Sequence, residues 1–173
     1  MSRSTGQVIN DSLQLSLGYA HRLLTDVSTD RFARLSAPGG QTIQSNHPAF
    51  IYGHLSTYAP RILEDLGAAV LEIPDGFTEL FAKDTDCQDD ADGSIYPAQD
   101  AITEFFFAGY EAVAAALQAA DESVYQGPNP LGGRMTELFP SLGSLHNFYV
   151  GGHVMIHMGQ MSAWRRMEGL GPA

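Results

Sequence analysis

Hydrophobic residues recur every three or four positions in four segments of the chain, which is the spacing of a helix with one apolar face. These segments cover residues 5–27, 46–66, 97–120 and 144–168. In the first segment we expect the apolar face to carry Val8, Ser12, Leu15, Tyr19, Leu23 and Val27. No stretch shows the alternating pattern of a strand. The pattern therefore predicts an all-α fold, a four-helix bundle formed by a single domain over residues 1–173.

Turn-forming residues separate the predicted helices. The connections 72–97 and 121–144 are rich in Asp, Gly and Pro, and only residues 77–82 suggest a short helical turn. Asn46 is a candidate N-cap for the second helix, and Pro60 predicts a kink within it. The connection between the second and third helices is long enough to cross the bundle and leave those helices parallel.

Negative charge dominates the composition, with 20 Asp and Glu against 9 Lys and Arg and a formal charge of −11. This charge disfavours nucleic acid and anionic membrane surfaces as partners, because no basic run offsets it locally. No apolar stretch reaches the ~20 residues that span a bilayer, and no secretory leader is evident. The single Cys87 forms no intramolecular disulfide. We therefore expect a soluble cytoplasmic protein that does not bind membranes.

Three of the six histidines lie in the last predicted helix. His153 and His157 are four residues apart, so both side chains lie on one face and could bind the same metal ion. A third ligand must come from another helix, and His21, His47 and His54 are the candidates. We choose His54, which lies in mid-helix on the inward stripe of the second segment. His47 is expected at a rim, and His21 in a structural role.

Two buried imidazoles without partners would cost on the order of 2 kcal/mol or more, which favours a metal site over an uncompensated core pair. Three neutral ligands leave a divalent ion its full charge and open positions for water, a thiolate or a substrate oxygen. Imidazole donors suit zinc or nickel first, with iron or manganese also possible.

The segments 46–55 and 153–160, which read NHPAFIYGHL and HVMIHMGQ, resemble the DinB-like superfamily of metal-binding four-helix bundles. In that family a histidine of a Gly-His-Leu-like segment in the second helix joins two histidines of an H-x-x-x-H-x-G-Q segment in the fourth. Carried over by residue, the resemblance implies His54, His153 and His157 as ligands. It also implies a homodimer. The family includes thiol-dependent S-transferases, among them a mycothiol-dependent maleylpyruvate isomerase branch.

Helical spacing nominates further residues around the triad. Tyr58, Tyr149 and Gln160 lie three or four residues from a triad histidine, where each could hydrogen-bond a ligand imidazole or a substrate. For the two tyrosines the spacing is equally consistent with packed aromatics whose hydroxyls reach the rim. His47 and His146 each precede a triad histidine by seven residues. These two histidines would lie at the same end of the bundle if the second and fourth helices are parallel, and at opposite ends if those helices are antiparallel.

No carboxylate lies within a turn of the triad on its own helices, although a hydrolase usually needs a general base beside its metal. Asp100 or Glu104 could supply one, but both suit the positive start of the third helix. We therefore expect a divalent metal that activates a low-molecular-weight thiol, or else water, against a small-molecule electrophile. The alternative is a non-catalytic metal-binding or ligand-binding bundle that acts as a dimer.

Two other features receive structural interpretations. Residues 84–93 do not follow the calcium-loop pattern, so we expect a solvated acidic loop whose charges make Cys87 a poor nucleophile. Gly151 and Gly152 are costly inside a helix, which indicates that another helix or a ligand approaches the backbone there.

Overall fold

The computed structural model describes residues 2–173, in which all regular elements are helices and no β-strand occurs. The predicted all-α class is therefore confirmed. In chain order the helices are α1 (Thr5–Leu23), α2 (Thr29–Phe32), the 3₁₀ turn η1 (Pro38–Gly40), α3 (Pro48–Ser56), α4 (Ala59–Asp65), α5 (Phe77–Phe81), α6 (Gln99–Ala119), α7 (Glu122–Gln126), α8 (Gly133–Leu138), α9 (Leu142–Asn147), the π-helix η2 (Phe148–His153) and α10 (Val154–Met167). None of the described helices is long and apolar enough to cross a membrane.

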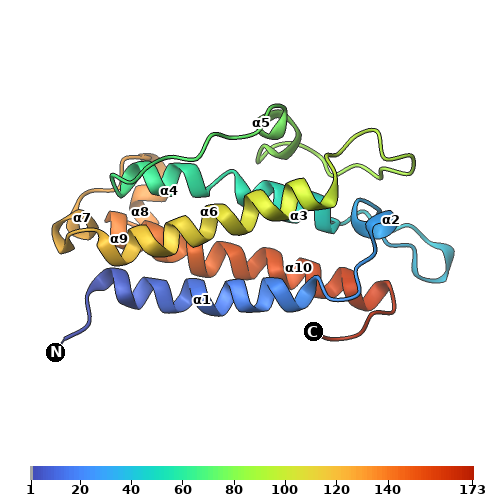
Figure 1. The fold of residues 1–173 in the computed structure, drawn as a ribbon, viewed down its shortest axis with the longest axis horizontal. Coiled ribbons are helices and arrows are strands. Elements are labelled where there is room, and N and C mark those ends of the chain that lie inside the picture. Colours follow the sequence, from blue (N-terminus) through green and yellow to red (C-terminus); the bar gives the residue numbers. More distant parts are fainter. Residues whose placement is uncertain (1) are drawn as a thin grey trace.

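The long elements lie side by side, with α1 and α3 each packed against both α6 and α10 (Figure 1). Tyr52 of α3 packs on Phe106 of α6, and the Tyr110 hydroxyl donates to the Leu55 carbonyl oxygen at 3.1 Å. Residue numbers rise together across this contact, so α3 and α6 run parallel. The long crossover expected from the sequence, which contains the short α5, joins them.

The expected face of the first helix is partly wrong. Val8 and Leu15 are 53% and 66% exposed, and the helix ends at Leu23. The buried face is displaced by about one residue and carries Ile9, Leu13 and Leu17. Apolar residues occur on both sides of this helix, and its contacts with α6 and α10 decide which side is buried.

The second predicted helix is two helices. It breaks at Thr57 and Tyr58, and Pro60 lies in the first turn of α4, where its missing N–H costs nothing. The N-cap of α3 is His47 rather than Asn46, because the His47 Nδ1 accepts from the Phe50 N–H at 3.2 Å.

The last predicted helix begins at Leu142 and contains a six-residue π-helical stretch, η2, before α10. A Cβ placed on Gly151 would lie 3.3 Å from the Cβ of Ser12 in α1. This bears out the close helix approach expected at Gly151. Gly169, with φ 77°, follows the end of α10, close to the predicted end of this helix at residue 168. The predicted connection 121–144 contains two short helices, α7 and α8.

Candidate metal centre

Three histidines from two separate helices meet in the structure. His54 projects from α3, and His153 and His157 project from η2 and the first turn of α10. Their ring centroids are 4.8 to 5.5 Å apart. One nitrogen from each ring lies within 4.8 Å of the other two. The structure therefore brings together the triad that the sequence nominated.

The Nδ1 atoms of two of these rings bind acceptors. His54 Nδ1 lies 2.9 Å from the Phe81 carbonyl oxygen, and His157 Nδ1 lies 2.8 Å from Gln160 Oε1. Gln160 Oε1 also accepts from the Asn46 side-chain amide at 3.2 Å. Because a carbonyl oxygen only accepts, Nδ1 of each ring carries the proton and Nε2 keeps a free lone pair. This is the tautomer of a metal-ligating histidine with a supporting acceptor.

Burial lowers the pKa of all three imidazoles. For His153 burial, together with the neighbouring His157 and His54, lowers the pKa to about 3. Burial also lowers the pKa of His54 and His157, against the opposing effects of the Phe81 carbonyl and the Gln160 side chain. The three rings are therefore neutral near pH 7, which is the form that binds a cation.

The cluster has dimensions that suit a divalent ion. A point equidistant from three atoms that are at most 4.8 Å apart lies within about 2.8 Å of each, and small rotations would reach the ~2.1 Å of a metal–imidazole bond. His153 Nδ1 is buried and has no hydrogen-bond partner among residues 2–173. Since an unpaired buried nitrogen is costly, an ion held through His153 Nδ1 would remove that cost. The three histidines therefore fit a divalent metal ion.

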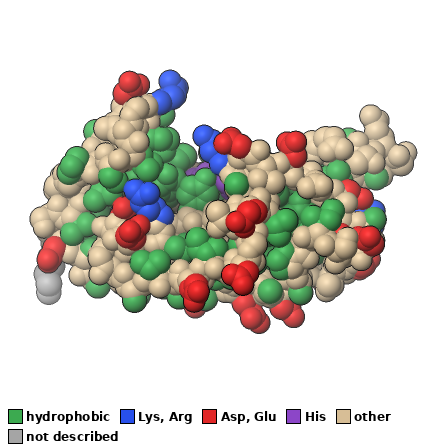
Figure 2. Space-filling model, turned by 90° about the horizontal axis from the view of Figure 1, so that it is seen from above, with side chains coloured by type: hydrophobic (Ala, Val, Ile, Leu, Met, Phe, Trp, Pro, Cys, Tyr) green, Lys and Arg blue, Asp and Glu red, His purple; other side chains and the backbone are tan. Residues whose placement is uncertain are grey.

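Aromatic rings surround the triad. The Tyr58 ring lies 4.6 Å from His153 and 5.2 Å from Tyr149, and the Phe148 ring lies 5.8 Å from His153, all as centroid distances. The cluster is partly open, because His153 and His157 are only partly buried. Figure 2 shows histidine surface in a hollow of this face, between hydrophobic side chains and a basic side chain. The neighbourhood is thus apolar around a small polar centre, as is usual for small-molecule sites.

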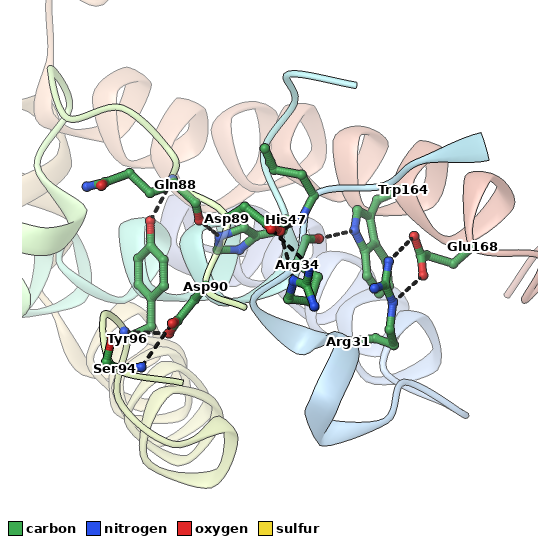
Figure 3. Close-up of polar contacts among 11 residues, drawn as sticks. Arg31, Arg34, His47, Gln88, Asp89, Asp90, Ser94, Tyr96, Trp164 and Glu168 are labelled. Atoms are coloured by element: carbon green, nitrogen blue, oxygen red, sulfur yellow. Dashed lines mark hydrogen bonds and ion pairs between the residues drawn. The ribbon is translucent and has the colours of Figure 1, made fainter. Parts of the chain in front are cut away.

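His47 is not part of this centre and does not lie at a rim, contrary to the expectation. It is fully buried, and its Nε2 lies 2.8 Å from the Gln88 carbonyl oxygen (Figure 3). The ring stands edge-on to Tyr96 at 4.9 Å. Because Nδ1 accepts from the backbone of α3, Nε2 carries the proton and donates to the loop. His47 therefore joins the start of α3 to the loop before α6.

His146 lies at the opposite end, because α3 and α10 are antiparallel. It is fully buried, with Nε2 3.3 Å from Asp65 Oδ2. Asp65 also accepts from Arg61 Nε at 3.2 Å. His21 is exposed and stacks on Phe107 at 3.7 Å, outside the cluster and in the structural role expected for it.

The acidic residues considered from the sequence do not join the histidine cluster. The cluster within residues 2–173 contains no carboxylate, and Asp100 and Glu104 are exposed. The acidic loop is less solvated than expected, because Asp90 is buried and accepts from the backbone N–H groups of Ser94 to Tyr96. Burial raises the pKa of Cys87 to about 11. Burial therefore disfavours the thiolate of Cys87 more than the neighbouring charges do.

No protein-family model matches the chain, and no curated protein matches it. The chemistry of the centre is therefore inferred from its own geometry.

The sequence analysis missed one partner of the centre, Phe81, and the partner of His146, Asp65. The Phe81 acceptor is a backbone carbonyl, which no residue pattern marks. Asp65 lies eleven residues after His54, and that spacing returns it to the same side of a helix. The eleven-residue spacing could therefore have indicated Asp65 from the sequence.

Proposed function

We propose that this chain is a metal-dependent enzyme of the DinB-like type, in which His54, His153 and His157 hold a divalent ion. Held there, such an ion would supply the Lewis acidity that prepares a low-molecular-weight thiol, or water, for attack on a small electrophile. The observation that carries the proposal is the convergence of three imidazole nitrogens within 4.8 Å, two of them on rings with supported Nδ1 atoms. A thiol is favoured, because water would need a general base and the cluster has no carboxylate.

A bound divalent ion would supply Lewis acidity and lower the pKa of a thiol beside it, with zinc or nickel preferred over iron or manganese. Side chains and backbone of the chain would orient the ligand rings and exclude water. Phe81 and Gln160 orient two ligand rings, and Asn46 holds Gln160 in place. The Tyr58 and Tyr149 rings restrict water around the reacting groups. Fixed ligand rings and the exclusion of water strengthen the electrostatic stabilisation of the charge that develops in the transition state.

We further propose that α1, α3–α4, α6 and α9–α10 form the four members of a four-helix bundle. Their mutual packing supports this assignment. The bundle would act as a homodimer. In support, the neighbouring helices α1 and α10 expose four large apolar side chains. These are Val8, Leu15, Met155 and Ile156. Exposed apolar surface of this kind is typical of an interaction face.

A rate comparison tests the catalytic proposal. Zinc-loaded and nickel-loaded wild type are assayed for conjugation of monochlorobimane with cysteine, glutathione or coenzyme A. We expect a metal-dependent acceleration with at least one thiol, which His153→Ala removes and His21→Ala retains. His21 is the matched control, because it is a histidine outside the cluster. If loaded protein binds metal but accelerates none of these reactions, the non-catalytic alternative replaces this proposal.

A further inference from the structure

The polar contacts of the histidine cluster continue along the two helical segments that carry it. Facing side chains recur every three or four residues on both segments. We call this line the polar seam, and it consists of His54, Tyr58, Arg61 and Asp65 on α3–α4 and His157, His153, Tyr149 and His146 on α10–α9. Tyr58 bridges its middle, next to both His153 and Tyr149, and Asp65 meets His146 at its far end.

Asp65 holds Arg61 at this far end. One Asp65 oxygen accepts from Arg61 Nε at 3.2 Å, and the other lies 3.3 Å from Nε2 of the fully buried His146. The carboxylate is thus fixed between a buried ring and the guanidinium. Arg61 uses one nitrogen in this contact, and its two Nη atoms make no hydrogen bond within residues 2–173. The Arg61 side chain is 43% exposed.

Two arginines near α10 and the loop before α6 are satisfied differently. Arg31 and Arg34 each give two nitrogens to a single carboxylate, Glu168 and Asp89 respectively. Arg61 in contrast keeps its outer pair of donors open. The charge of Arg61 also opposes the rise in the pKa of Tyr149 that burial causes, which is consistent with a guanidinium close to that phenol.

We propose that the polar seam is one elongated binding site, whose small-molecule ligand carries a carboxylate that pairs with Arg61 while its reacting end lies at the three histidines. This inference rests on the proposed function and adds a substrate class to it. The planar guanidinium matches a carboxylate through two parallel N–H donors. Tyr58 and Tyr149 lie between the two ends, with ring centroids 5.2 Å apart, and would border the carbon body of the ligand.

Thiols with and without a carboxylate test this assignment. The probes are mercaptoethanol and the acids mercaptoacetate, mercaptopropionate and mercaptobutyrate, which place a carboxylate at increasing distances from sulfur. Each is titrated into cobalt(II)-loaded protein, and the sulfur-to-cobalt charge-transfer absorbance reports binding. The proteins are wild type, Arg61→Gln, Arg61→Lys and the control Arg22→Gln. Arg22 lies on α1 over Tyr19, outside the seam.

We expect Arg61→Gln to weaken at least one of the acids about tenfold and to leave mercaptoethanol unchanged. Arg61→Lys should recover part of the loss, and Arg22→Gln should behave as wild type. The assignment is overturned if Arg61→Gln weakens none of the acids, or weakens mercaptoethanol equally. If cobalt does not bind, or no thiolate band develops with any probe, the proposed function fails and this inference fails with it.

Discussion

Replacement of Gly53 by alanine tests whether the α5 segment supports the metal centre. Gly53 lies in α3, directly before His54. A Cβ placed there would lie 2.5 Å from Cδ1 of Phe81 and closer still to Cε1 and Cζ. The Phe81 ring is fully buried against Phe77 and Tyr96, so it has little room to move. The substitution should therefore displace Phe81, whose carbonyl accepts from His54 Nδ1.

Two opposing effects set the size of the stability change. Alanine is better than glycine in a helix by about 1 kcal/mol. Overpacking of a rigid core typically costs about 1–3 kcal/mol. We expect a net decrease in the free energy of unfolding of up to about 2 kcal/mol. Loss of a partner that orients a ligand ring lowers metal affinity by about 10-fold to 100-fold, and we expect Gly53→Ala to fall in that range.

Urea unfolding of the metal-free protein measures the first effect, and competition with a chromogenic zinc chelator measures the second. Gly159→Ala is the matched control, because a Cβ at Gly159 in α10 meets nothing within 4 Å. The control should gain about 0.5–1 kcal/mol and keep its metal affinity. If Gly53→Ala gains the same stability as the control, the packing of Phe81 on α3 does not hold His54 as described.

Three further predictions concern the same region. Gln160→Ala should lower zinc affinity about tenfold by freeing His157 Nδ1, with unfolding by urea little changed; unchanged affinity would contradict this role. In the folded protein the pKa of His153 is lowered to about 3, whereas in the unfolded chain it is about 6.5. As the pH falls below about 6.5, His153 is therefore protonated in the unfolded chain before it is protonated in the folded protein. The urea midpoint of metal-free protein should therefore decrease from about pH 6.5 towards pH 3, and a midpoint independent of pH there would be inconsistent with neutral buried rings. Cys87, with its pKa raised to about 11, should react with a disulfide reagent at least about tenfold more slowly in folded than in urea-unfolded protein; equal rates would show that the thiol is not protected.

The sequence predicted those parts of the centre that depend on local periodicity. His153 and His157 are one helical turn apart in any helix, and the inward stripe of the second segment selected His54 among three candidates. The structure places all three in one cluster. The same periodicity failed at Val8 and Leu15, because α1 has apolar residues on two sides and only its neighbours determine which is buried.

The features that sequence reasoning missed depend on long-range contacts. The fully buried position of His47 follows from a loop 41 residues later, whose Gln88 carbonyl accepts from the ring. The Phe81 acceptor belongs to the last residue of the short helix α5, in the connection between α4 and α6. The π-helical turn that contains Gly151 has no pattern of its own beyond two adjacent glycines, although the close approach of α1 to Gly151 could be inferred from them.

The most direct test of the metal centre is elemental analysis of protein purified without an affinity tag. Wild type, His153→Ala and the control His21→Ala are compared after dialysis against metal-free buffer. The account predicts close to one divalent ion per chain in wild type and in His21→Ala, and almost none in His153→Ala. Equal metal content in wild type and His153→Ala, or no metal in wild type even after incubation with zinc or nickel, would contradict it.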